Sequence, residues 1–101
     1  MSFEQLQKAL WKLIEIHEKY PFVTYRGFKF SYRVKGGEIF VNRKTKSITQ
    51  SSVNIALKHA MDLQGDVAGP KKLEVFGASY LYAMLIHFGL IQEPEIYEEA
   101  E

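Results

Sequence analysis

An alternation of apolar and polar residues, closed by two glycines, constrains the fold of this chain more than any other feature. The alternation covers residues 28–35, and its apolar members are Phe28, Phe30, Tyr32 and Val34. A period of two is expected of a strand with one buried face. Gly36 and Gly37 follow at once, and they supply the positive φ angles that a tight two-residue turn requires. The sequence therefore predicts a β-hairpin whose return strand runs from residue 38 to residue 42 or 43.

A two-residue turn also fixes the register of this hairpin. It places Lys35 opposite Glu38, and both strands then agree about which face is buried. The predicted core face holds Tyr32, Val34, Ile39 and Val41, and the outer face holds Lys29, Ser31, Arg33, Phe40 and Asn42. We expect a short third strand over residues 22–25, with Gly27 as a bend or a bulge.

Helical signals flank the hairpin on both sides. Residues 3–19 repeat apolar side chains at three- and four-residue steps, which is one face of a helix. Ser2 and Gln5 match a capping box at its start. A second helix is expected to begin after Thr49 as N-cap, with Ser47 as a competing cap.

The second half of the chain contains further helix boundaries. Gly65 is expected at the C′ position of the second helix. Pro70 suits the first position of a short helix that runs to about residue 76. Ser79 is then expected to cap a last helix, which Gly89 ends.

Together these elements predict one α+β domain over residues 1–91, in the order α-β-β-α-α, with an antiparallel hairpin packed on helices. A chain of 101 residues with 47% hydrophobic residues can build such a core. Because it contains no cysteine, it can form no disulfide. Residues 92–101 carry five glutamates and no cation, and we expect a flexible acidic tail. The predicted core consists of Phe3, Leu6, Leu10, Leu13, Phe28, Phe30, Tyr32, Val34, Ile39, Val41, Val53, Leu57, Met61, Leu81, Leu85 and Phe88.

The formal net charge of +1 hides an uneven distribution along the chain. Residues 26–46 contain seven Lys or Arg and one Glu, a net charge of +6, whereas residues 47–101 contain three cations and eight acids, a net charge of −5. Cationic side chains neutralise phosphates, and an exposed ring between them can stack on a base. The predicted nucleic-acid-binding residues are Lys29, Arg33, Phe40, Arg43, Lys44 and Lys46.

One observation and one alternative interpretation weigh against nucleic acid as the partner. The sequence pI of about 7.9 lies below the value of about 9 that is typical of nucleic-acid-binding domains. If Arg33 lay over the ring of Phe40 as a cation–π pair, both residues would belong to an ordinary solvent-facing sheet. The acidic tail could also shield the basic face in the free protein.

Lys71 and Lys72 form a weaker candidate site for an anion. They follow the loop of residues 65–70, which is superficially similar to a phosphate-binding loop. Pro70 stands where such a loop has its second glycine, and Lys72 stands where it has a hydroxyl. The spacing therefore excludes nucleoside triphosphate binding, although two lysines beside the start of a helix can hold one anion.

The segment from Lys72 to Ser79 resembles the end of the first helix and the glycine turn of a helix-turn-helix motif. Residues 80–88 would then be the second helix, and residues 89–91 resemble the close of winged-helix recognition helices. The resemblance implies that residues 80–88 read DNA. A reading helix needs polar side chains that reach base edges, and this one offers only tyrosines and His87. We therefore expect a core helix.

The apolar character of the last helix supports a second hypothesis for function. Its large side chains exceed what one small core needs, and surplus apolar surface is commonly buried in a partner or a second copy. The predicted interface residues are Tyr80, Tyr82, Met84 and Phe88. The leading hypothesis is a binding protein for an anionic partner, with nucleic acid first. The alternative is a protein–protein interaction module, an adaptor or inhibitor of the bacterial or phage accessory type, which forms a homodimer through this helix.

The sequence contains no catalytic or metal-binding pattern. No serine stands in a G-x-S-x-G setting, and the acids gather in the tail, which leaves acid–base catalysis without a facing pair. His17, His59 and His87 show no H-x-x-x-H spacing. We therefore expect no enzyme activity, no metal, no cofactor and no small-molecule substrate.

The most apolar stretch, residues 80–91, is shorter than the roughly 20 residues that a membrane-spanning helix needs. A signal peptide begins with a basic segment followed by an apolar run, and the first residues of this chain show no such pattern. We expect a cytoplasmic protein without a membrane partner.

Overall fold

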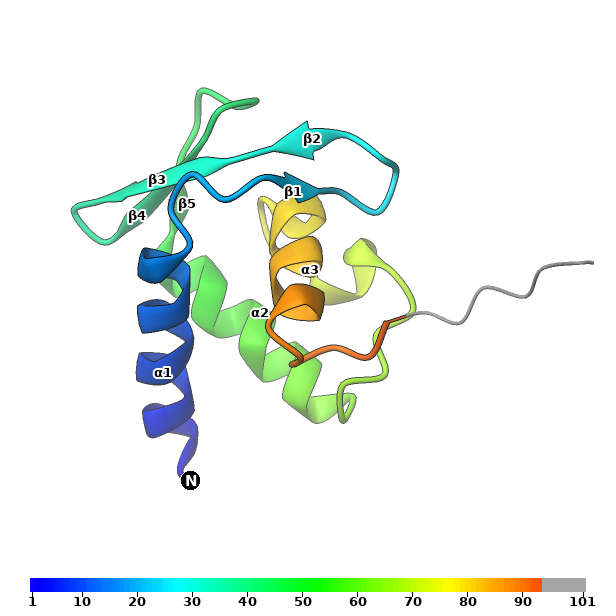
Figure 1. The fold of residues 1–101 in the computed structure, drawn as a ribbon. Helices are drawn as coiled ribbons and strands as arrows, with labels where there is room; N and C mark the ends of the chain where they lie inside the picture. The colour runs from blue at the N-terminus through cyan, green and yellow to red at the C-terminus, as the bar shows by residue number, and fades with distance from the viewer. Residues whose placement is uncertain (94–101) are drawn as a thin grey trace, which may run out of the picture.

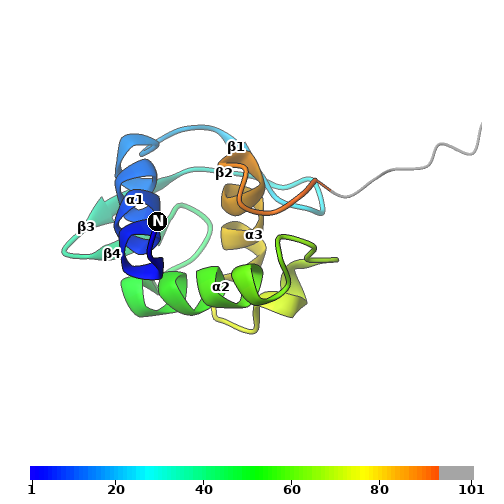
Figure 2. The ribbon, with the colours of Figure 1, turned by 90° about the horizontal axis from the view of Figure 1, so that it is seen from below.

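Within residues 1–93, which the computed structural model describes, three α-helices lie beneath a set of short strands (Figure 1). The helices are α1 (Phe3–Ile16), α2 (Gln50–Asp62) and α3 (Ala78–His87), and a 3-10 turn, η1 (Pro70–Leu73), precedes α3. Helix α2 packs against both α1 and α3, and Figure 2 shows it running across the lower edge of the layer that they form. This arrangement confirms the predicted α+β fold with a hairpin packed on helices.

The strands of the described residues form two small antiparallel sheets. One pairs β1 (Phe22–Val23) with β2 (Lys29–Phe30), and the other has the order β3 (Tyr32–Lys35), β4 (Glu38–Val41), β5 (Ile48–Thr49). The predicted hairpin is β3–β4, and its predicted register is confirmed, with Lys35 opposite Glu38 and Tyr32 opposite Val41. Gly36 and Gly37 have φ angles of 59° and 74°. Both glycines thus adopt the positive φ angles that the turn requires.

The predicted first strand of the hairpin is interrupted at Ser31. The backbone N–H of Ser31 donates to the side-chain oxygen of Asn42 at 3.1 Å, and the N–H of Asn42 donates to the Ser31 carbonyl at 3.0 Å. A side chain thus replaces the backbone acceptor of the ladder at this point, and the segment before it pairs with β1 instead of β4. The strand expected over residues 22–25 covers only Phe22–Val23 and belongs to a separate sheet, and β5 was not predicted.

Two of the predicted core residues are exposed. Phe28 is 51% exposed because it lies in the turn between β1 and β2, which Gly27 bends at a φ of 93°. Phe3 is 40% exposed in the first turn of α1. The core instead includes Phe22 and Ile48, which the sequence analysis left out, at 4% and 1% exposed.

The helix ends show which capping predictions hold. The capping box of Ser2 and Gln5 is present, and the hydroxyl of Thr49 accepts from the N–H of Ser52 at 3.1 Å. Ser47 is not a cap, because its hydroxyl donates to the carboxylate of Glu38 and the chain then continues into β5.

The helices end slightly differently from the prediction. Helix α1 ends at Ile16 rather than near residue 19. After α2, both Gln64 and Gly65 have positive φ angles, of 55° and 78°, and the N–H of Gly65 donates to the Ala60 carbonyl at 2.8 Å. Gln64 therefore occupies the C′ position, and Gly65 follows it in a Schellman motif. Each helix of the described residues is too short or too polar to cross a bilayer.

The predicted cap at Ser79 and the predicted end of the short helix near residue 76 are both wrong. The left-handed backbone of Glu74, at a φ of 56°, stops η1 at Leu73. Gly77, at a φ of 80°, is the N-cap of α3. A Cβ at Gly77 would come within 2.5 Å of the Ile48 side chain, so that a glycine here permits close packing of α3 against β5.

We predict that Gly77→Ala destabilises the fold more than Gly89→Ala. Both glycines have a φ near 80° (80° and 82°), but a Cβ at Gly89 meets nothing within 4 Å. The backbone strain of a left-handed alanine, about 1–2 kcal/mol, is common to both variants, and only Gly77→Ala adds overlap with Ile48, worth about 1–3 kcal/mol. Urea unfolding of both variants measures the difference. Equal losses in the free energy of unfolding would show that Ile48 does not restrict this position.

We predict that Tyr32 makes stability fall at high pH. Its hydroxyl donates to the Ile14 carbonyl at 2.7 Å, and burial, followed by the nearby Glu18 carboxylate, raises its pKa above the ordinary value of 10.0. The neutral phenol is favoured in the folded state, so this contribution is present below about pH 10 and is lost as pH rises further.

Urea unfolding between about pH 9 and pH 11 measures this effect. Tyr32→Phe should lower stability at neutral pH by about 1–3 kcal/mol, because the Ile14 carbonyl loses its donor, and should flatten the alkaline decline. Tyr20→Phe is the control, because Tyr20 is 40% exposed. An unchanged alkaline decline in Tyr32→Phe would contradict the assignment.

Candidate nucleic-acid interface

Three of the predicted binding residues lie on the outer face of the strands. Lys29 is in β2, and Arg33 in β3 pairs across the hairpin with Phe40 in β4. All three are exposed, and Phe40 has 43% of its surface in water. The alternation of the strands requires this placement, because the neighbours Tyr32, Ile39 and Val41 point into the core.

The other three predicted binding residues follow β4. Arg43, Lys44 and Lys46 are exposed in the connection between β4 and β5. The guanidinium of Arg43 lies 4.8 Å from the ring centre of Phe28, and the ammonium of Lys46 lies 4.7 Å from that of Phe76. These are the two cation–π contacts within residues 1–93. Arg33 and Phe40 thus form no such pair, and Phe40 is not covered in the way that the ordinary-sheet interpretation required.

The cations of residues 26–46 lack acidic partners in the described part of the chain. The ion pair found there joins Lys58 and Asp62 on α2, at 3.3 Å. Glu38 is the one acid of residues 26–46, and its carboxylate accepts a hydrogen bond from the Ser47 hydroxyl. No Lys or Arg of this region therefore forms an ion pair among residues 1–93, although Glu38 lies opposite Lys35 and the Glu18 carboxylate accepts from the N–H of Val34. The six predicted residues, from Lys29 to Lys46, are called the basic surface below.

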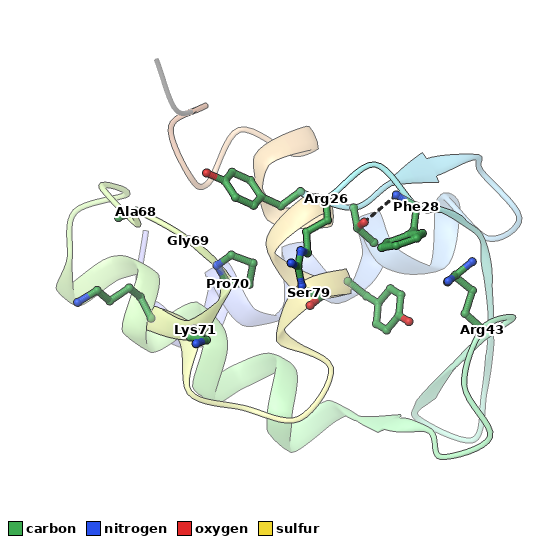
Figure 3. A pocket seen from close by; sticks show the side chains of 12 residues that line it. Arg26, Phe28, Arg43, Ala68, Gly69, Pro70, Lys71 and Ser79 are labelled. Atoms are coloured by element: carbon green, nitrogen blue, oxygen red, sulfur yellow. Dashed lines mark hydrogen bonds between the residues drawn. The ribbon is translucent and has the colours of Figure 1, made fainter. Parts of the chain in front are cut away.

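A cleft of about 680 Å³ opens beside the basic surface (Figure 3). One wall is the turn between β1 and β2, the other is the segment before and within η1, and the start of α3 lies between them. It is lined by Thr24, Tyr25, Arg26, Phe28, Arg43, Ala68, Gly69, Pro70, Lys71, Lys72, Ser79 and Tyr80. Four of these residues are cationic and three are aromatic, and no acid is among them. We call it the cationic cleft.

The cationic cleft joins two sites that the sequence analysis treated separately. Arg43 belongs to the basic surface, whereas Lys71 and Lys72 were the weaker anion site, and all three line the same cleft. Figure 3 shows Arg26 between Pro70 and Lys71 on one side and Phe28 and Arg43 on the other.

The turn between β1 and β2, which forms one wall of the cleft, was not among the predicted binding residues. Tyr25, Arg26 and Phe28 lie there, and Tyr25 and Phe28 are 58% and 51% exposed. Thr24 closes this turn, since its hydroxyl accepts from the N–H of Phe28 at 3.0 Å. The signal in the sequence was an arginine and a bending glycine, Gly27, between two aromatic residues.

Three of the four predicted interface residues are buried in the monomer. Tyr80, Tyr82 and Met84 are 7%, 0% and 1% exposed. The hydroxyl of Tyr82 donates to the Val67 carbonyl at 2.9 Å, and burial, followed by the neighbouring Tyr25, raises the pKa of Tyr82 above its ordinary value. The expected surplus of apolar surface on α3 is therefore used inside the fold.

The remaining surface of α3 is also covered in part. Phe88 is partly buried, with its ring centre 4.9 Å from that of His17. Most of the apolar side chains of α3 face the core, and its exposed residues are Ser79 and His87, so the helix offers few polar side chains that could reach base edges. The core-helix prediction for residues 80–88 thus agrees with the burial.

The three histidines do not converge. His17 and His87 are neighbours, with ring centres 5.4 Å apart. His59 lies elsewhere, and its Nδ1 is 2.6 Å from the Leu73 carbonyl. Among residues 1–93, no three His, Asp or Glu side chains cluster in a way that could hold a metal ion.

The predicted acidic tail lies mostly in residues 94–101, outside the described residues. Its first residue is fixed to the body, because the N–H of Gln92 donates to the Gly65 carbonyl at 2.9 Å. Ile91 before it is buried.

Comparison of the chain with protein-family models, with curated proteins and with solved structures finds no match. The function is therefore inferred from the chemistry of the basic surface and the cationic cleft.

Proposed function

We propose that this chain is a non-enzymatic binding protein for nucleic acid, which it contacts through the basic surface. The observation that carries the proposal is the exposed positive charge of residues 26–46, which has no acidic partner within residues 1–93. Lys and Arg side chains that neutralise phosphates release condensed counterions, and this release drives binding. A cationic surface without internal partners favours a polyanion.

Exposed rings among the cations favour nucleic acid over other polyanions. Phe40 and Phe28 have 43% and 51% of their surface in water, close to the arginines Arg33 and Arg43. A base can stack on such a ring or on a guanidinium plane. A nucleic acid can therefore use both the charges and the rings of this surface.

The near-neutral pI is compatible with this function because the charge is concentrated in one region. Residues 26–46 have a net charge of +6 in a chain of net charge +1. At physiological salt the Debye length is about 8 Å, so a bound strand responds to the local charge. Acids that lie farther away in the protein have little effect on the binding of that strand.

We predict salt-dependent binding of labelled DNA and RNA, measured by fluorescence anisotropy. The double variant Arg33→Glu with Lys44→Glu should weaken binding. It should also reduce the magnitude of the negative slope of log K against log salt by about 2, because two phosphate contacts are lost. The matched control is Lys8→Glu with Lys12→Glu on α1, which changes the net charge equally at two exposed positions. The control should retain the slope.

No binding at low salt would exclude the proposed function. Equal weakening by the two double variants would show that net charge alone is responsible, and the basic surface would lose its role.

A further inference from the structure

We infer that the cationic cleft accommodates one unstacked nucleotide of a single-stranded nucleic acid, with its base against the exposed rings and its phosphate among the cations. This inference rests on the proposed function and specifies its ligand. The volume of about 680 Å³ falls within the range of about 300–1,000 Å³ that small-ligand sites occupy.

The rings of the cleft are placed for stacking. Tyr25 and Phe28 are 58% and 51% exposed although their neighbours Phe22 and Phe30 are buried. Tyr80, the third aromatic residue of the lining, is only 7% exposed and therefore offers little surface for stacking. The turn between β1 and β2 thus exposes two large rings, of which Phe28 lies beneath the Arg43 guanidinium, and a stacked base would remove exposed ring surface from water.

The cations of the cleft reach it from separate parts of the chain. Arg26 comes from the turn and Arg43 from the connection after β4, whereas Lys71 and Lys72 come from η1. None of the four forms an ion pair within residues 1–93. A phosphate between the two walls would face cations on both sides, as the positions of Arg26 and Lys71 in Figure 3 indicate. A single phosphate can therefore meet several charge-assisted donors at once.

The combination of rings and cations favours a single strand over a duplex. In a duplex each base is stacked and paired, so that only its edge is accessible from a groove. A base in a single strand can be splayed out, stacked on a side chain and followed by its phosphate. The cleft offers both contacts within one depression, and Arg43 links it to the basic surface, along which the rest of the strand can lie.

The test removes one exposed ring and uses a matched ring outside the cleft as control. Phe28 and Phe76 are 51% and 41% exposed, and each lies under a cation at nearly the same distance, 4.8 Å and 4.7 Å. Phe28 lines the cleft and Phe76 does not. Neither ring is in the core, so both alanine variants should fold, which circular dichroism verifies. The probe is labelled oligothymidylate of about 15 nucleotides, compared with a duplex of equal length.

We expect the wild type to bind the single strand about tenfold more tightly than the duplex. Phe28→Ala should lower single-strand affinity about tenfold, since one stacked base contributes about 1–3 kcal/mol, and should weaken duplex binding by less. Phe76→Ala should alter neither by more than about twofold. Lys71→Glu should lower the salt dependence of single-strand binding.

The other outcomes distinguish a failure of the cleft inference from a failure of the proposed function. Equal affinity for single strand and duplex, or equal effects of Phe28→Ala and Phe76→Ala, would overturn the cleft inference while the proposed function stands. Equal displacement of the probe by AMP and by unlabelled oligomer, at the same nucleotide concentration, would assign the cleft to free nucleotides and overturn the strand inference. Displacement by polyglutamate in place of nucleic acid would assign it to an acidic peptide. Absence of any binding would overturn both claims.

Discussion

The register of the β3–β4 hairpin is the constraint on which the rest of this structure depends. A slip by one residue would turn every side chain of the hairpin to the opposite face. In the observed register Tyr32, Ile39 and Val41 are at most 3% exposed, while Arg33 and Phe40 face water. The same pairing therefore builds the core above the helices and exposes the basic surface.

Local patterns in the sequence were sufficient for this hairpin and for two helix starts. The glycine pair and the alternation determine the turn, and Ser2 and Thr49 cap α1 and α2 with their own hydroxyls. The predictions failed where a distant residue decides the structure. Asn42 interrupts the strand at Ser31, and α3 begins at a glycine that packs against β5. Such contacts between remote segments leave no short-range periodicity that a sequence reading could detect.

The candidate site also has a part that the sequence predicts and a part that only the folded structure reveals. The charge asymmetry indicated the basic surface, because charged residues of a half-buried hairpin must lie on its outer face. The cleft could not be predicted, since its walls come from residues 24–28 and 68–72, which only the packing of α3 brings together. The apolar composition of α3 was misleading as an interface signal: a small domain with short strands uses large side chains such as Tyr82 to fill its interior.

The most direct test of this account is a two-dimensional 15N–1H NMR titration of the protein with a short single-stranded oligonucleotide. The account predicts that shift changes concentrate in the two walls of the cleft, residues 24–28 and 68–72, and in the connection after β4. The exposed face of α1 should remain unchanged. Changes confined to α1 or α2, or an unperturbed spectrum at saturating oligonucleotide, would contradict it.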